Sequence, residues 1–205
     1  MTNDPGHSER AERPMPNERI PLPDPNSMTD EQRQTAESLI RGPRKGVVGP
    51  FIPLMQSPRL LNLIEPLGTE LRFHGRLDER IRELVICAVA RHTSNQFEWT
   101  VHAALAVAAG VSRDTISAVL EGRIPAGIPE DELLALEFAQ RLMCTHAIPD
   151  SLYAEAQINF GSEGIVELTT LIGYFVTVCW IMNVARTHSD GNPDLGIVRP
   201  YVSAT

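Results

Sequence analysis

Apolar side chains recur at steps of three and four residues along most of the chain, which is the spacing of amphipathic helices. A first helix is predicted from Thr29, a good N-cap residue, to about Ile40. Another begins at Ser57–Pro58, and Pro66 is expected to kink or end it. No segment alternates between apolar and polar residues as a half-exposed strand would. The pattern therefore predicts an all-α protein.

The most regular stretch, Asp78–Gly110, predicts two helices separated by a polar break at residues 92–95. Gly110 suits the position after a helix, and Ser112 can cap a short helix that follows. Further helices are predicted over residues 131–144, 149–160 and 162–187. We expect a single helical domain over residues 28–205, with its core motif at 76–121.

Proline and glycine interrupt this pattern in two places. Residues 1–27 contain six prolines and no periodic apolar face, which predicts a flexible Pro-rich N-terminal arm. Val47–Leu54 is apolar but too rich in glycine and proline for a regular element. Phe51 in this segment is a candidate to cover the core or a pocket.

Charge and cysteine usage narrow the function classes. A formal net charge of −8, without a basic stripe, argues against nucleic-acid binding. The three cysteines, Cys87, Cys144 and Cys179, form no CxxC pair and suggest buried thiols in a reducing compartment. Polar residues interrupt the longest apolar run, Leu168–Val184, so we expect no membrane span and a cytoplasmic protein.

Three titratable residues of the two central helices are candidates for catalysis. Glu83 lies beside an apolar run on the first helix, and Asn95, Glu98 and His102 share one face of the second. Carboxylates and an imidazole on apolar helices suit proton transfer. Glu98 is four residues before His102, so it can orient the ring and favour its cation.

Structural roles remain open for the same side chains. Glu83 can pair with Arg80 or another arginine, and Asn95 and Glu98 can form a capping box. His102 can be a core histidine with satisfied hydrogen bonds. A metal site is another use of the two glutamates and the histidine, but their spacing fixes no tetrahedral ligand set, so we expect no metal.

The sequences RIRELVICAVA and FEWTVHAALAVAAGVS, together with the upstream GPFIPLMQSPRLL, resemble the carboxymuconolactone decarboxylase family. That family also contains the AhpD-like alkylhydroperoxidases. The resemblance covers about Gly49–Glu121 and implies an AhpD-like helical bundle.

The AhpD-like branch carries a glutamate, a CxxC motif, and a histidine four residues after the second cysteine. Glu83 matches that glutamate and His102 that histidine, while Asn95 and Glu98 stand at the two cysteine positions. Because both thiols are missing, the disulfide chemistry that reduces a peroxide cannot run at this site. The sequence Glu98-Trp99-x-x-His102 resembles the decarboxylase branch better.

This resemblance implies a cofactor-free lyase of aromatic-compound catabolism, assembled as a trimer or hexamer, that removes CO₂ from a small carboxylated lactone. It implies His102 as the proton donor or shuttle, Glu98 as the residue that orients it, and Glu83 as a second relay or polarising group. Further residues are expected to contact the substrate: Phe51, Arg91, Asn95 and Trp99. Two alternatives stay open, a peroxidase of the AhpD type and a non-catalytic ligand-binding member of the fold.

Overall fold

The computed structural model describes residues 18–198, and within that range the chain forms α-helices and no β-strand. This confirms the all-α prediction. The helices are α1 (Asp30–Arg41), α2 (Phe51–Leu54), α3 (Pro58–Phe73), α4 (Glu79–His92), α5 (Gln96–Ala108), α6 (Arg113–Leu120), α7 (Glu130–Thr145) and α8 (Asp150–Ala185), followed by the 3₁₀ helix η1 (Pro193–Leu195).

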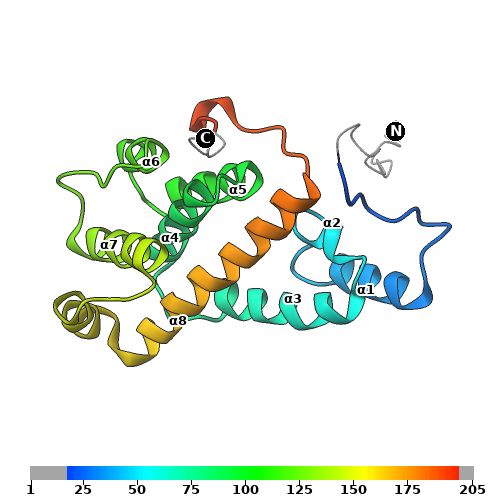
Figure 1. Cartoon of the computed structure of the whole chain (residues 1–205), viewed down its shortest axis with the longest axis horizontal. Coiled ribbons are helices and arrows are strands. Elements are labelled where there is room, and N and C mark those ends of the chain that lie inside the picture. Colours follow the sequence, from blue (N-terminus) through cyan, green and yellow to red (C-terminus); the bar gives the residue numbers. More distant parts are fainter. Residues whose placement is uncertain (1–17, 199–205) are drawn as a thin grey trace, which may run out of the picture.

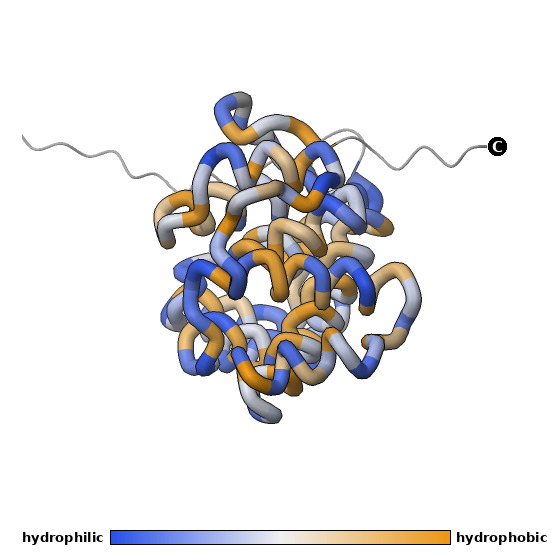
Figure 2. The backbone as a smooth tube through the Cα atoms, turned by 90° about the vertical axis from the view of Figure 1, so that its left-hand side faces the viewer, coloured by the Kyte–Doolittle hydropathy of each residue, from blue (hydrophilic) through white to orange (hydrophobic). Residues whose placement is uncertain are grey.

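Helix α4 is the centre of the packing. It contacts α5, α6, α7 and α8, while α8 crosses the molecule and reaches α2 and α3 at its other end (Figure 1). Apolar stretches run through the interior of this bundle, and many hydrophilic stretches lie at outer turns (Figure 2). Because neighbours surround α4 on several sides, all of residues 81–87 are buried, including the charged Arg82 and Glu83. This burial brings a carboxylate into the core.

Local capping signals placed the helix ends correctly. Thr29 forms a capping box with Gln32 at the start of α1, and Ser112 accepts a hydrogen bond from the Thr115 amide at the start of α6. Gly161 has φ 67° and ψ 175°, so it divides α8 into two helical segments at the predicted boundary. Only glycine adopts such a backbone conformation without strain.

The structure differs from two local predictions. Pro66 does not end α3, which continues from Pro58 to Phe73. Proline removes the hydrogen bond to the Asn62 carbonyl, but both residues are exposed, so water can satisfy that carbonyl. The segment expected to be irregular contains the short helix α2, with Phe51 and Leu54 buried.

The segments next to both ends of the described range pack on the chain itself. The Arg19 amide donates to the Ala185 carbonyl, and Leu22 packs against the core cluster between α1, α2 and α3. Residues 1–17, most of the predicted arm, lie outside the described residues. Near the C-terminus, the Val198 amide donates to the Gln96 side chain at 2.7 Å.

Helix α8 is apolar enough, by length and composition, to pass as a membrane span, contrary to the expectation from sequence. Its apolar character has another source, because 44% of its most apolar window is buried inside the bundle. The core helix of a soluble protein passes the same test.

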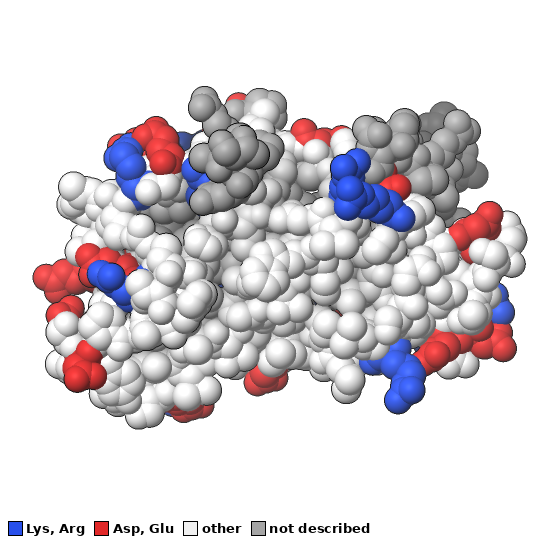
Figure 3. All heavy atoms as spheres, viewed as in Figure 1, with Lys and Arg blue, Asp and Glu red and all other residues white. Residues whose placement is uncertain are grey.

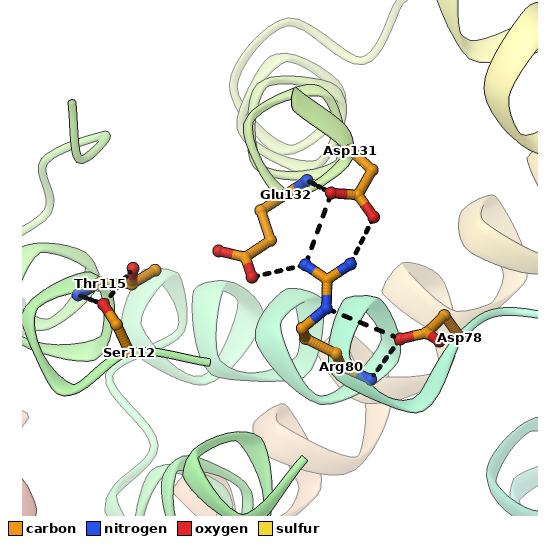
Figure 4. A network of polar contacts seen from close by, with 6 residues as sticks. All are labelled: Asp78, Arg80, Ser112, Thr115, Asp131 and Glu132. Atoms are coloured by element: carbon orange, nitrogen blue, oxygen red, sulfur yellow. Dashed lines mark hydrogen bonds and ion pairs between the residues drawn. The ribbon is translucent and has the colours of Figure 1, made fainter. Parts of the chain in front are cut away.

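Arg80 joins the start of α4 to the start of α7. Its guanidinium contacts Asp131 and Glu132, each at 2.5 Å, and lies 3.9 Å from Asp78 (Figure 4). Arg80 is therefore not the partner of Glu83. Glu83 instead faces the interior of the bundle, where it meets Arg82 and His102.

Candidate active site

A cavity of about 230 Å³ lies where α3, α5 and α8 meet the segment before α2. Its wall is mainly aromatic and aliphatic, and its polar groups are two arginines, one glutamate, one histidine and one tyrosine. The lining residues are Pro43, Arg44, Val48, Pro50, Phe51, Arg72, Phe73, Phe97, Glu98, Val101, His102, Tyr174, Phe175 and Val178. An apolar cavity with a few convergent polar groups is the usual form of a small-molecule site.

At this cavity the imidazole of His102 lies between two carboxylates. Glu83 Oε2 is 2.5 Å from Nδ1, and Glu98 Oε2 is 3.0 Å from Nε2. All three side chains are almost completely buried. The predicted grouping of Glu83, Glu98 and His102 therefore exists in the structure as a Glu–His–Glu cluster.

The two carboxylates hold different positions relative to the cavity. Glu98 lines it together with His102, whereas Glu83 contacts the ring from α4 and is not part of the lining. Arg82 Nε lies 3.3 Å from Glu83, and Phe175 packs edge-on against the His102 ring with centroids 5.1 Å apart. The ring is therefore fixed from behind and beside, and its Nε2 edge faces Glu98 at the cavity.

Hydrogen-bond counting shows that this cluster holds a transferable proton. A neutral imidazole has one N–H, yet both ring nitrogens face a carboxylate oxygen. Either His102 is an imidazolium or one glutamate is protonated, and both arrangements contain the same extra proton. Burial alone lowers the pKa of His102, but the hydrogen bonds to Glu83 and Glu98 outweigh it and raise the pKa above 6.5.

The pKa of Glu83 moves the opposite way. Burial raises it, but the hydrogen bond to His102 and the charges of His102, Arg72 and Arg82 bring the pKa below 4.5. Glu83 is thus a carboxylate at neutral pH, and it stabilises the positive ring of His102. This arrangement is typical of a site in which one group orients and charges another.

Arg44 and Arg72 supply positive charge at the same cavity. Arg44 lies over the rings of Phe51 and Phe73, with its guanidinium carbon 5.3 and 5.4 Å from their centroids. Burial lowers the pKa of Arg72 below its ordinary value, although the charge of Glu83 opposes this. Both arginines keep a buried N–H group that has no hydrogen-bond partner among residues 18–198, Arg44 Nη2 and Arg72 Nε.

Three of the predicted substrate contacts do not lie at this cavity. Trp99 is fully buried in the core around α4, α5 and α6, and its indole N–H donates to the Leu195 carbonyl at 2.9 Å. Asn95 is the N-cap of α5, and its amide group donates to α8. Arg91 donates to the Leu120 carbonyl and lines a different cavity. Of the four, Phe51 alone is in the lining.

Sequence reasoning missed the two arginines and Tyr174. Arg44 lies in a loop rich in glycine and proline, Arg72 at the end of α3, and Tyr174 in the apolar stretch of α8. No local spacing connects these positions, since only the tertiary fold brings them to one cavity. Among residues 18–198, no group of three or more histidine, cysteine or acidic side chains has an arrangement that could hold a metal ion.

The cysteines are separate from this cavity's lining. Cys87 and Cys179 are buried, and burial raises the pKa of both thiols, that of Cys87 well above 9.0. Cys144 is exposed on α7. A buried thiol with a raised pKa has little thiolate to act as a nucleophile.

Fold and site together define an all-helical protein with a buried Glu–His–Glu cluster beside a small cavity. A solved structure with a similar fold is described as an alkylhydroperoxidase AhpD core, an uncharacterized peroxidase-related protein from Ralstonia eutropha JMP134. The TM-score is 0.71 at 17% sequence identity, and the match covers 89% of this chain and 96% of that one. At this identity the likeness shows a shared fold.

The carboxymuconolactone decarboxylase family matches residues 58–141, a region that contains Glu83, Glu98 and His102. The family match and the AhpD-like fold agree. The family match covers less than half of the chain, so the chain is similar to this family over residues 58–141 and shares the AhpD-like fold. No curated protein matches the sequence.

Proposed function

We propose that this protein is a cofactor-free acid–base enzyme that acts on a small carboxylated substrate, with loss of CO₂ from a lactone acid as its reaction type. The observation that carries this proposal is the position of His102. Its Nε2 edge and Glu98 meet at the cavity, while Glu83 charges and orients the ring from behind. The family match supports the reaction type.

In this reaction the bond between the substrate carboxylate and its ring carbon breaks, and CO₂ leaves. The electron pair of that bond passes through the ring to the lactone carbonyl and forms an enolate. The Glu98–His102 pair then gives one proton to carbon, and solvent returns a proton to the site. A general acid whose proton is available near neutral pH suits this step, because the proton must be present when the enolate forms.

We assign the roles of the two glutamates from their positions. Glu83, expected as a second relay or polarising group, is proposed as the positioning residue, because it holds Nδ1 and does not line the cavity. Glu98 was expected to orient the ring. It lies beside His102 Nε2 at the cavity, so we propose that the proton between these two groups is passed to the substrate. His102 keeps its role as the proton donor.

Thiol-dependent peroxide reduction is the alternative activity. The described structure gives it little support, because the two buried cysteines have raised pKa values and neither lines the cavity. The alternative makes a distinct prediction. Peroxide turnover that disappears when the cysteines are replaced by serine would favour it over acid–base chemistry.

We also propose that the protein self-associates through the face of α8. The surface over α8 and part of α3 is almost free of charged side chains, which lie at its margins (Figure 3). Exposed apolar residues on these helices include Leu60, Leu63, Leu67, Val166, Trp180 and Val184. A large uncharged apolar face favours burial against a second copy of the chain.

Turnover in D₂O, followed by proton NMR, tests the proposed chemistry. The panel consists of unsaturated carboxy-lactones and related acids, and the variants are wild type, His102→Gln and His92→Gln as a matched control. Wild type and the control are expected to release CO₂ and place deuterium on carbon, while His102→Gln remains folded but inactive. Full activity in folded His102→Gln would overturn the proposal.

A further inference from the structure

Two arginines at the cavity carry hydrogen-bond donors that no described residue uses. Arg44 Nη2 and Arg72 Nε are buried and have no hydrogen-bond partner. The side chain of Arg44 is only 9% exposed. An unsatisfied buried donor destabilises the folded protein, and more so when it is charged. A ligand that accepted these hydrogen bonds would recover this energy.

The charges around these donors favour an anion. Within residues 18–198, Arg44 has one ion pair, with Glu65 at 3.5 Å from its Nε atom, and none joins Arg72 to a carboxylate. Burial is the main cause that lowers the pKa of Arg72, and the positive charge of Arg44 lowers it further, as expected for two like charges that repel each other. A carboxylate between them would remove this repulsion and accept N–H groups from both.

Tyr174 adds a hydroxyl group to the same corner of the cavity. A Cβ atom at Gly68 would lie 2.0 Å from Tyr174 Oη and 3.1 Å from Arg44 Nη2, so both atoms occupy the space beside this glycine. Burial raises the pKa of Tyr174 to about 12, and the hydroxyl therefore keeps its proton and can donate it in a hydrogen bond.

We infer that Arg44, Arg72 and the Tyr174 hydroxyl bind a carboxylate of the substrate, and that this carboxylate remains in the product. The binding of a carboxylate is inferred from the cavity alone, whereas its retention in the product rests on the proposed function. The aromatic wall, with Phe51 and Phe73 against the Arg44 guanidinium, suits a flat ring next to that carboxylate.

The retained position follows from the energetics of bond breaking. A carboxylate that leaves as CO₂ loses its negative charge in the transition state, and its ionic hydrogen bonds weaken as it leaves. Two arginines would then stabilise the ground state more than the transition state and slow the reaction. The carboxylate bound by the arginines therefore anchors the substrate without reacting, and the carbon that loses CO₂ faces Glu98 and His102. A substrate that loses CO₂ here must carry a second carboxylate.

Carboxylate binding can be tested without any turnover by comparing two ligands. One is 2-furoate, a flat five-membered ring acid, and the other is its neutral amide, 2-furamide. Isothermal titration of wild type is expected to show at least about a tenfold preference for furoate, since a charge-assisted hydrogen bond contributes about 1.5–3 kcal/mol. Arg44→Gln and Arg72→Gln are expected to lose this preference. Arg91→Gln, an arginine at another cavity, is expected to keep it.

His102→Gln separates this inference from the proposed function, because it removes the proton donor and leaves the arginines in place. If His102→Gln still prefers furoate and wild type shows no turnover, the proposed chemistry is refuted and carboxylate binding by the arginines is supported. If an arginine variant does not fold, Gly68→Ala replaces it, because its new methyl group displaces Tyr174. Equal binding of furoate and furamide by wild type, or no binding of either, would overturn the inference.

Discussion

Replacing Glu83 by glutamine probes the Glu–His–Glu cluster with a minimal change of shape. The glutamine can still accept a hydrogen bond from His102 Nδ1–H through its amide oxygen. Its NH₂ group, however, then faces Arg82 Nε, which the Glu83 carboxylate approaches at 3.3 Å. The substitution therefore removes one negative charge and places two donors against each other at a buried position.

The expected cost follows from these two contacts. Changing a charge-assisted hydrogen bond to a neutral one and leaving a donor unsatisfied reduce the free energy of unfolding by about 2–4 kcal/mol together. Removing the partner entirely, as in Glu83→Ala, costs about 3–5 kcal/mol, because a buried charge loses its compensation. Arg82 retains Glu79 at 3.5 Å, which limits the loss in both variants.

Two measurements check this reasoning. Urea denaturation gives the free energy of unfolding, and an NMR titration of the histidine ring protons gives the pKa of His102. The pKa is expected to fall in Glu83→Gln, because the charge and hydrogen bond that raise it are weakened. Glu79→Gln, an exposed glutamate on the same helix, is the matched control and should leave the pKa unchanged. A His102 pKa in Glu83→Gln at or above the wild-type value would refute the argument.

Two further predictions concern pH and assembly. The Glu–His–Glu cluster should stabilise the fold most between about pH 4.5 and 6.5. The pKa of Glu83 is lowered by folding, so its contribution is lost as pH falls through its folded pKa. The pKa of His102 is raised by folding, so its contribution is lost as pH rises through its folded pKa. Denaturation of wild type and His102→Gln from below pH 4.5 to above pH 6.5 checks it, and a difference between them that stays constant over this wider range would contradict it. Trp180→Asp, at a position 61% exposed, should dissociate the proposed oligomer in light-scattering measurements, while the control Ile158→Asp, at a position 84% exposed, should not. An unchanged mass of the Trp180→Asp variant would exclude this face as the interface.

The parts of the fold that sequence predicts well are those decided by neighbouring residues. Thr29 caps its helix with its own side chain, and Gly161 breaks α8 because its backbone can adopt a positive φ. Pro66 misled the prediction for the same local reason. A proline disrupts a helix most where the carbonyl that it leaves without a hydrogen bond is buried. Asn62, whose carbonyl Pro66 leaves free, is exposed, and this exposure depends on how α3 packs in the whole molecule.

The site divides in the same way. Glu98 and His102 are four residues apart on one helix, so their contact follows from helical geometry. Glu83 comes from another helix, and the family resemblance supplied its place in the motif. Arg44, Arg72 and Tyr174, which we propose donate hydrogen bonds to the substrate carboxylate, come from three separated segments. The sequence offered Arg91 instead, which lies next to the motif in the chain but at another cavity in space.

The competing interpretations of Glu98 are compatible in the structure. The Asn95 side chain accepts the Glu98 amide N–H at 2.9 Å, so the helix has its cap. A full capping box would also require the Glu98 carboxylate to accept the Asn95 amide N–H, but that N–H donates to the Ala90 carbonyl at 2.8 Å. The Glu98 carboxylate is therefore not needed for the cap and turns to His102 Nε2. Asn95 thus supports the site without touching the cavity, because its cap fixes the first turn of the helix from which Glu98 and His102 project.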